Sequence, residues 1–162
     1  MALFLATHHN RVDKKGRVSV PAQFRAAIAD QSFQGIVVFP SHKATALEGF
    51  SMGQMEQLSS NIDSFDMFSD AHDDLATTMF GSSVPLPFDG EGRIVLPKDL
   101  CAHAGITDAV AFVGLGKKFQ IWEPEAFAAH QAAAQARMRT AGQTVPSRAH
   151  QNTAPPHHNG GN

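Results

Sequence analysis

An internal repeat constrains the fold of this chain more than any other feature. The segment DKKGRVSVPAQF at residues 13–24 resembles DGEGRIVLPKDL at residues 89–100, and the two lie 76 residues apart. They share four identities that carry structure, namely Asp13/Asp89, Gly16/Gly92, Arg17/Arg93 and Pro21/Pro97. A chain with this pattern is expected to fold as two copies of one small unit.

Each copy carries the same predicted local structure. Asp-x-x-Gly-Arg is typical of a turn, because Asp accepts hydrogen bonds from nearby backbone N–H groups and Gly adopts positive φ. The runs RVSV and RIVL that follow are typical of strands, and Pro21 and Pro97 suit the first position of a short helix. Two further strands are expected in each copy, near 35–39 and 44–48, and near 109–113 and 118–122.

Three longer segments have other patterns. Ser51 begins a capping box, and the apolar spacing of Met52, Met55, Leu58 and Ile62 predicts a helix there. A second helix is expected near 66–79, with Phe68, Leu75 and Met79 facing inward, and a third over 124–138. Gly105 stands where the cap of the short helix in the second copy is expected. Beyond about residue 140 the chain has few apolar residues, which predicts a disordered tail.

The size of each copy favours one shared core. A unit of about 60 residues is marginal by itself, whereas the 162-residue chain with 43% hydrophobic residues can bury a core. Packing about a pseudo-twofold axis, with strands interleaved into one barrel, would also hide the strand edges. We therefore expect an α+β fold in which two repeats form a pseudo-twofold β-barrel flanked by helices.

The charge is distributed unevenly along the chain. The formal net charge is only −2, but residues 1–43 carry +4, residues 44–92 carry −9 and residues 93–162 carry +3. Local fields rather than the total govern contact with a polyanion, so a near-neutral chain does not exclude a DNA partner.

Composition and motifs argue against several other classes. The single cysteine, Cys101, rules out an intrachain disulfide, and no apolar run is long enough for a membrane span. The N-terminus does not read as a signal peptide, so a cytoplasmic protein is expected. No catalytic constellation, metal-ligand spacing or nucleotide-binding loop is present, so we expect neither an enzyme nor a cofactor. We interpret the run Asp70–Asp74 as a solvated helix face, and Phe119 and Trp122 as strand core.

The duplicated turn is the candidate site. An arginine at a hairpin tip can donate to guanine O6 and N7, and a two-stranded ribbon fits the major groove. Arg17 would read bases while Lys14 and Lys15 contact phosphate. In the second copy Arg93 remains, but Gly90 and Glu91 replace the lysines, so we expect the first copy to dominate. The alternative is a purely structural hairpin in which Asp and Arg pair locally.

These segments, together with GLGKKFQIWEPEAF at residues 114–127, resemble the MraZ family of bacterial regulators, which is similar to the AbrB/SpoVT class of DNA-binding proteins. The resemblance covers roughly residues 1–138. It implies two swapped-hairpin repeats, at residues 1–62 and 63–138, followed by the tail at 139–162. The family's DxxxR motif maps onto Asp13 and Arg17 and again onto Asp89 and Arg93.

The resemblance also implies a function. It implies a homo-oligomeric ring, associated with the nucleoid, that binds direct repeats in double-stranded DNA upstream of its own division and cell-wall gene cluster, usually as a repressor. The helix between the copies, which is often basic in the family, is here SDAHDDLATTMF without Lys or Arg. That departure argues against a DNA contact by this helix. The alternative function is a protein–protein adaptor that uses the acidic inter-repeat region.

Overall fold

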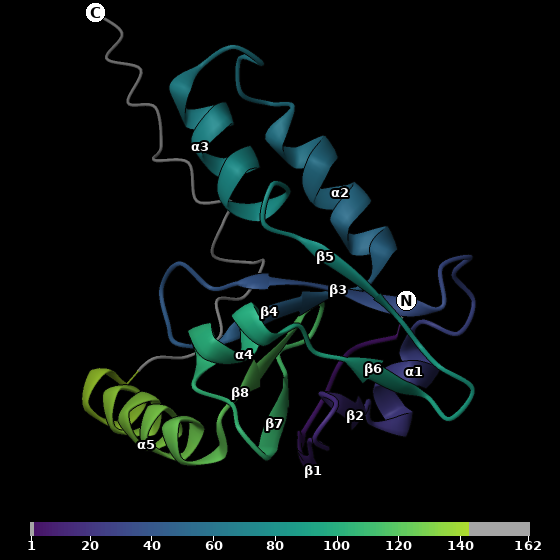
Figure 1. Ribbon diagram of the computed structural model, residues 1–162. Helices are drawn as coiled ribbons and strands as arrows, with labels where there is room; N and C mark the ends of the chain where they lie inside the picture. Colours follow the sequence, from purple (N-terminus) through teal and green to yellow (C-terminus); the bar gives the residue numbers. More distant parts are fainter. Residues whose placement is uncertain (1, 143–162) are drawn as a thin grey trace, which may run out of the picture. The chain divides into compact units, whose positions relative to one another are not determined.

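The computed structural model describes residues 2–142. The described chain divides into a compact unit that extends to Ala129 and a second unit from His130 onward. All eight strands and four of the five helices of residues 2–142 lie in the first unit, and helix α5 (Pro124–Ala141) begins in the first and continues in the second (Figure 1). None of these helices has the length and apolar character that a membrane crossing requires.

The first unit has two antiparallel sheets, which confirms the predicted α+β class. A six-stranded sheet has the order β1-β7-β8-β4-β3-β5, and β2 and β6 form a separate two-stranded ribbon. The strands are β1 (Thr7–Arg11), β2 (Arg17–Ser19), β3 (Gly35–Pro40), β4 (Leu47–Phe50), β5 (Val84–Pro87), β6 (Arg93–Val95), β7 (Ala109–Gly114) and β8 (Phe119–Trp122). The remaining helices are α1 (Ala22–Ala27), α2 (Met52–Ile62), α3 (Asp70–Met79) and α4 (Lys98–Ala104).

The strand pairing is symmetrical between the two halves of the chain. Strand β1 pairs with β7 of the second half, and β5 of the second half pairs with β3 of the first. Two pairs of equivalent residues face each other at the centre of their ladders, Val18 opposite Ile94 and Glu48 opposite Gln120. Each half therefore completes the sheet of the other, and the strand order reads the same when the halves are exchanged.

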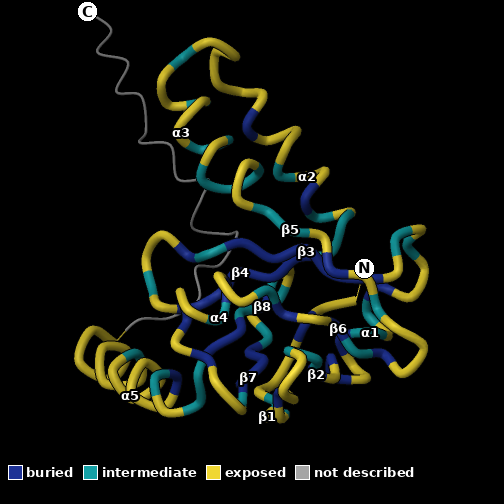
Figure 2. Tube along the Cα trace, in the orientation of Figure 1, coloured by how far each residue is buried: buried dark blue, intermediate teal, exposed yellow. Residues whose placement is uncertain are grey.

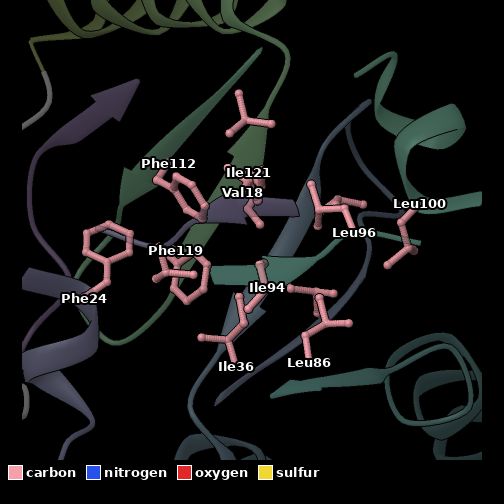
Figure 3. Packing of buried hydrophobic residues seen from close by; sticks show 14 of the residues in the cluster. Val18, Phe24, Ile36, Leu86, Ile94, Leu96, Leu100, Phe112, Phe119 and Ile121 are labelled. Carbon is pink, nitrogen blue, oxygen red and sulfur yellow. The ribbon is translucent and has the colours of Figure 1, made fainter. Parts of the chain in front are cut away.

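The core lies between the ribbon and the large sheet and draws on both halves (Figure 3). Val18 and Ile94, on the inner face of the ribbon, are each 1% exposed. The Phe24 ring of α1 lies 5.2 Å from the ring of Phe119 and 6.1 Å from that of Phe112. In Figure 2, β3, β4 and β7 are drawn largely in the dark blue of buried residues. The strand-core interpretation of Phe119 and Trp122 is confirmed, since both are buried.

The boundaries of several elements differ from the prediction. Pro21 and Pro97 are the residues before α1 and α4 rather than their first helical residues, because their ψ angles of 138° and 147° are extended. The strand expected at 44–48 begins at Leu47. A turn occupies the preceding residues, where the Ser41 hydroxyl accepts hydrogen bonds from the backbone N–H groups of Lys43 and Ala44. Gly105 ends α4 as predicted.

Helices α2 and α3 form a hairpin that projects from the large sheet (Figure 1). Ser51 caps α2 as predicted by accepting a hydrogen bond from the Gln54 N–H at 3.0 Å, and Met55 is buried against Val37. The inward orientation predicted for Phe68 is wrong, because its side chain is 89% exposed. Phe68 precedes Ser69, the cap of α3, so the helical period does not apply to it.

The C-terminal helix continues beyond its predicted end. Helix α5 extends to Ala141, so residues 139–141 of the segment expected to be a disordered tail are helical. Residues 143–162 of that segment lie outside the described residues.

Candidate nucleic-acid interface

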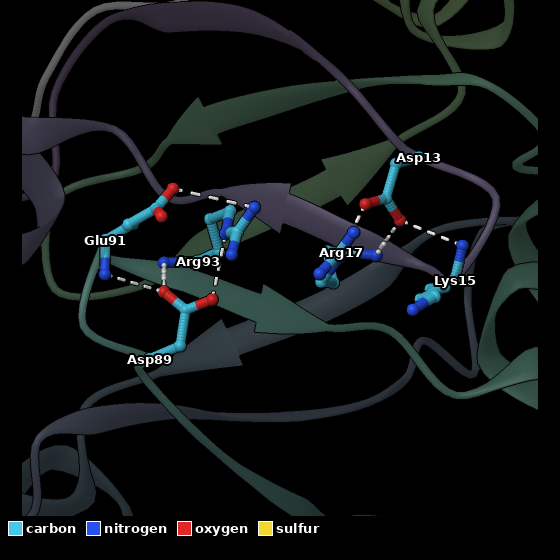
Figure 4. Close-up of polar contacts among 6 residues, drawn as sticks. All are labelled: Asp13, Lys15, Arg17, Asp89, Glu91 and Arg93. Atoms are coloured by element: carbon cyan, nitrogen blue, oxygen red, sulfur yellow. Dashed lines mark hydrogen bonds and ion pairs between the residues drawn. The ribbon is translucent and has the colours of Figure 1, made fainter.

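The two Asp-x-x-Gly-Arg turns have the same geometry. In the first, Asp13 Oδ1 accepts hydrogen bonds from the backbone N–H groups of Lys15 and Arg17, both at 2.9 Å, while Oδ2 accepts from Arg17 Nε at 2.6 Å. In the second, Asp89 Oδ1 accepts from the backbone N–H groups of Glu91 and Arg93, both at 2.9 Å, and Oδ2 accepts from Arg93 Nε at 2.8 Å (Figure 4). Gly16 and Gly92 have φ angles of 82° and 75°, a backbone region that residues with a side chain rarely adopt. Each aspartate therefore fixes both the turn and its arginine.

The turns lie at opposite ends of the β2–β6 ribbon (Figure 4). Arg17 is paired with Val95, and Ser19 with Arg93, so these four side chains share one face of the ribbon. This face is open to solvent: the Arg17 and Arg93 side chains are 37% and 28% exposed, and Val95 is 53% exposed. The ribbon thus buries Val18 and Ile94 and presents two arginines outward.

The two arginines differ in their surroundings. Arg17 is held through Nε only, and among residues 2–142 no acceptor is recorded for its two Nη groups. In Arg93, Nη1 also lies 3.6 Å from Glu91 Oε2. A guanidinium held at Nε with free Nη groups can still donate two parallel hydrogen bonds to a planar partner. The first turn therefore presents an available fork, and the second presents one partly neutralised by a carboxylate.

The acid–base properties of the turns follow from these contacts. The backbone N–H of Arg17, together with its guanidinium, holds the pKa of Asp13 below the ordinary value, despite an opposing effect of desolvation. The backbone N–H of Arg93 lowers the pKa of Asp89 in the same way. The Asp89 carboxylate in turn raises the pKa of Arg93. Both aspartates are accordingly ionised at neutral pH.

The structure brings together most of the predicted site residues. Lys14 and Lys15 lie exposed in the first turn beside Arg17, while Gly90 and Glu91 occupy the corresponding places beside Arg93. Among the motif residues, Asp13, Gly16, Asp89 and Gly92 build the turns, and Pro21 and Pro97 immediately precede the helices that follow. The local Asp–Arg pairing that the structural alternative required is therefore present in both turns.

Sequence reasoning missed two residues that support the ribbon. Asn10 of β1 donates from Nδ2 to the Ser19 carbonyl at 2.7 Å. Arg25 of α1 donates from Nε to the Val20 carbonyl at 3.1 Å, and its guanidinium packs directly over Gly92 of the opposite turn. In the sequence, Arg25 lies in the first copy among apolar helix residues. Only the pairing of β2 with β6 brings it to the second turn.

Other candidate chemistry receives no support from the described residues. Among residues 2–142, no group of three or more His, Cys, Asp or Glu side chains could hold a metal ion, and this includes the run at Asp70–Asp74. Desolvation, followed by the charge of Asp99, raises the pKa of the half-buried Cys101 thiol, which disfavours a nucleophilic thiolate.

A family model and several curated relatives that match this chain all carry the name MraZ. A family model described as "MraZ protein, putative antitoxin-like" matches residues 3–77 and again residues 79–147. The chain is 48% identical over 143 residues to the transcriptional regulator MraZ of Gluconobacter oxydans, which covers 86% of this chain and 87% of the relative. It is 46% identical to that of Gluconacetobacter diazotrophicus over 86% of this chain and 90% of the relative. It is 45% identical to the transcriptional regulator MraZ of Rickettsia bellii, over 83% of this chain and 91% of the relative.

Proposed function

The chain belongs to the MraZ family, and from this premise we propose that it is a sequence-specific DNA-binding transcriptional regulator rather than an enzyme. One observation carries the proposal: the β2–β6 ribbon presents Arg17 and Arg93 on its single open face, each held by its own aspartate. The relatives are named transcriptional regulators, which supports the same assignment.

The ribbon suits the major groove. A two-stranded ribbon is one of the elements that the groove admits, and bidentate arginine to guanine is its commonest specific contact. Arg17 and Arg93 are separated by one strand and two residues, which places their Cα atoms roughly 8 Å apart. Both can therefore enter one groove. Arg17, with its free Nη groups and with Lys14 and Lys15 beside it, supplies the larger share of binding.

The decisive experiment compares two substitutions of Arg17. Arg17→Ala should abolish binding to a duplex that covers the DNA upstream of the protein's own coding sequence. Arg17→Lys keeps the charge but removes the fork, so it should retain non-specific binding and lose preference over a scrambled duplex. Arg93→Ala should weaken binding less than Arg17→Ala. Unchanged affinity and preference in both Arg17 variants would refute the role given to the ribbon.

The finer aspects of the function belong to the same proposal. The protein would act in the cytoplasm, on the nucleoid, as a homo-oligomeric ring that represses its own division and cell-wall gene cluster through upstream direct repeats. Several ribbons on one ring bind spaced repeats by avidity, which offsets the few base contacts of each ribbon. Native mass spectrometry tests the ring, and a reporter driven by the upstream region tests repression against activation.

The proposal extends to the repeat architecture of the chain. We propose that residues 1–62 and 63–138 are two AbrB/SpoVT-like swapped-hairpin repeats that close into a pseudo-twofold barrel. The symmetrical register of the ribbon and the exchange of β1 and β5 support this. The two separate matches of one family model support it as well.

A second candidate function is a protein contact through the acidic inter-repeat region. The observation that favours it is the tip of the α2–α3 hairpin, where Phe65, Met67 and Phe68 are 44%, 63% and 89% exposed. Phe68→Ser should then remove a protein contact and leave DNA binding unchanged. Loss of DNA binding in this variant without loss of the oligomer would count against the adaptor.

A further inference from the structure

The surface beside the first turn is assembled from both halves of the chain. A hollow there is lined by Lys14 and Lys15 of the turn and, from the second half, by Lys98 and Cys101 of α4 and by Thr107. Lys98 belongs to the copy that contains the second turn, yet the exchange of strands places it beside the first. Its side chain is exposed, and it is not needed for the core.

A second hollow occupies the equivalent place beside the second turn. It is lined by Ala22, Arg25 and Ala26 of α1 together with Asp89, Gly90 and Gly92. In the repeat alignment Ala22 corresponds to Lys98, and Gly90 corresponds to Lys14. The first hollow therefore has three lysines against the single carboxylate of Asp13, whereas the second has one arginine against Asp89.

The two hollows also differ in the space they leave. Arg25 lies over the second turn so closely that a Cβ on Gly92 would come within 2.8 Å of three guanidinium-end atoms. The residue that corresponds to Arg25 beside the first turn is Cys101, which is smaller. Burial raises the pKa of its thiol, so an uncharged group stands there at neutral pH. The first hollow can thus admit an anion without repulsion from this position.

The carboxylate of Asp13 forms its ion pair with Arg17 and not with the three lysines. Its two carboxylate oxygens already accept from two backbone N–H groups and from Arg17 Nε. The ammonium groups of Lys14, Lys15 and Lys98 have no carboxylate within ion-pair distance among residues 2–142. Three unpaired ammonium groups around one recess are typical of a phosphate contact.

We propose that the hollow formed by Lys14, Lys15 and Lys98 binds a backbone phosphodiester of the DNA whose bases Arg17 reads, with Lys98 as a contact contributed by the second half of the chain. The inference rests on the proposed DNA-binding function and deepens it. It makes the cationic end of the ribbon a composite of both halves, and it orients the ribbon on the duplex, since the opposite end has no equivalent lysines.

The test is a salt titration of DNA binding by the full chain. Each neutralised phosphate contributes about 0.9 to the slope of log affinity against log salt. For each ribbon engaged, Lys98→Gln should reduce that slope by about 0.9 and should weaken binding roughly fivefold to tenfold at 0.1 M salt. The loss should be equal on upstream and scrambled duplexes, because a phosphate carries no sequence. Lys43→Gln, the same change in the β3–β4 turn, is the matched control and should leave the slope unchanged.

The possible failures are distinguishable. If Arg17→Ala abolishes binding while Lys98→Gln keeps the wild-type slope and affinity, the phosphate site is wrong and the proposed function stands. If Lys43→Gln lowers the slope as much as Lys98→Gln, the effect is one of total charge and the site is also wrong. If the wild-type chain binds neither duplex, the proposed function itself is refuted. Thermal unfolding followed by circular dichroism checks that the variants fold.

Discussion

The glycines of the two turns offer a sharp test of how the halves are joined. Both have positive φ, so an alanine at either place costs about 1–2 kcal/mol in backbone energy. What surrounds them differs. A Cβ on Gly16 would lie 2.9 Å from the Leu96 carbonyl oxygen, whereas on Gly92 it would lie 2.7 Å from Arg25 Cζ and Nε. Backbone cannot withdraw easily, but the end of a long side chain can.

The magnitudes follow from what must move. In Gly92→Ala the guanidinium swings away and gives up the 3.1 Å hydrogen bond from Arg25 Nε to the Val20 carbonyl, worth about 0.5–1.5 kcal/mol. Arg25→Ala has already lost this bond. The two changes together should therefore cost about 1 kcal/mol less than the sum of the single changes. Gly16→Ala displaces the backbone of Leu96, whose N–H also donates to the Gly16 carbonyl at 2.9 Å. This substitution should therefore cost more than Gly92→Ala. Its cost should add to that of Arg25→Ala without coupling.

Urea unfolding followed by fluorescence measures these costs. Trp122 is the only tryptophan and is 3% exposed, so its emission reports the first unit. All variants are compared at one protein concentration, because association would add to apparent stability. A Gly92→Ala cost that is the same with and without Arg25, or coupling of equal size for Gly16→Ala, would refute the energetic role given to Arg25 at the second turn.

Two further predictions concern charged groups. Lys118→Met leaves the buried Glu48 carboxylate with Gln120 as its remaining donor and should lower the free energy of unfolding by about 1–3 kcal/mol, less if Glu48→Gln is added; urea unfolding of the single and double variants measures both. The lowered pKa of Asp13 and Asp89 means that their stabilisation is complete above the ordinary carboxyl pKa of about 3.9 and is lost as pH falls through the lower folded value. Stability of the Asp13→Asn, Asp89→Asn variant should therefore fall less between pH 5 and pH 2, as acid titration of the unfolding midpoint would show.

The repeat in the sequence predicted local structure well because each turn is specified by its own residues. Asp, Gly and Arg at the spacing of 13, 16 and 17 can close the turn without help from the rest of the chain. The error at Phe68 arose where helical spacing was applied one residue before the cap Ser69. Local signals could place elements, but a short error at a helix start was enough to reverse the predicted orientation of a side chain.

The partner of each strand could not be predicted from local signals. Nothing in the residues of β1 distinguishes pairing with β3 from pairing with the equivalent β7, since two similar copies offer similar edges. The structure selects β7 for β1, and it pairs β2 with β6, which places Arg25 beside the second turn and Lys98 beside the first. The sequence therefore indicated the arginines of the ribbon and missed the residues that reach them from the other half.

This exchange gives a reason why a nearly neutral chain can face DNA. The net charge of −2 combines a basic start, an acidic middle and a basic end. Because the halves exchange strands, Lys98 from the basic end joins Lys14 and Lys15 from the basic start around one hollow. The exposed tip of the acidic segment lies on the α2–α3 hairpin, which contributes no residue to either hollow beside the ribbon. If the two halves were separate chains that did not associate, each would keep its arginine, but Lys98 would be separated from Lys14 and Lys15. The proposed phosphate contact therefore requires the two halves in one folded unit.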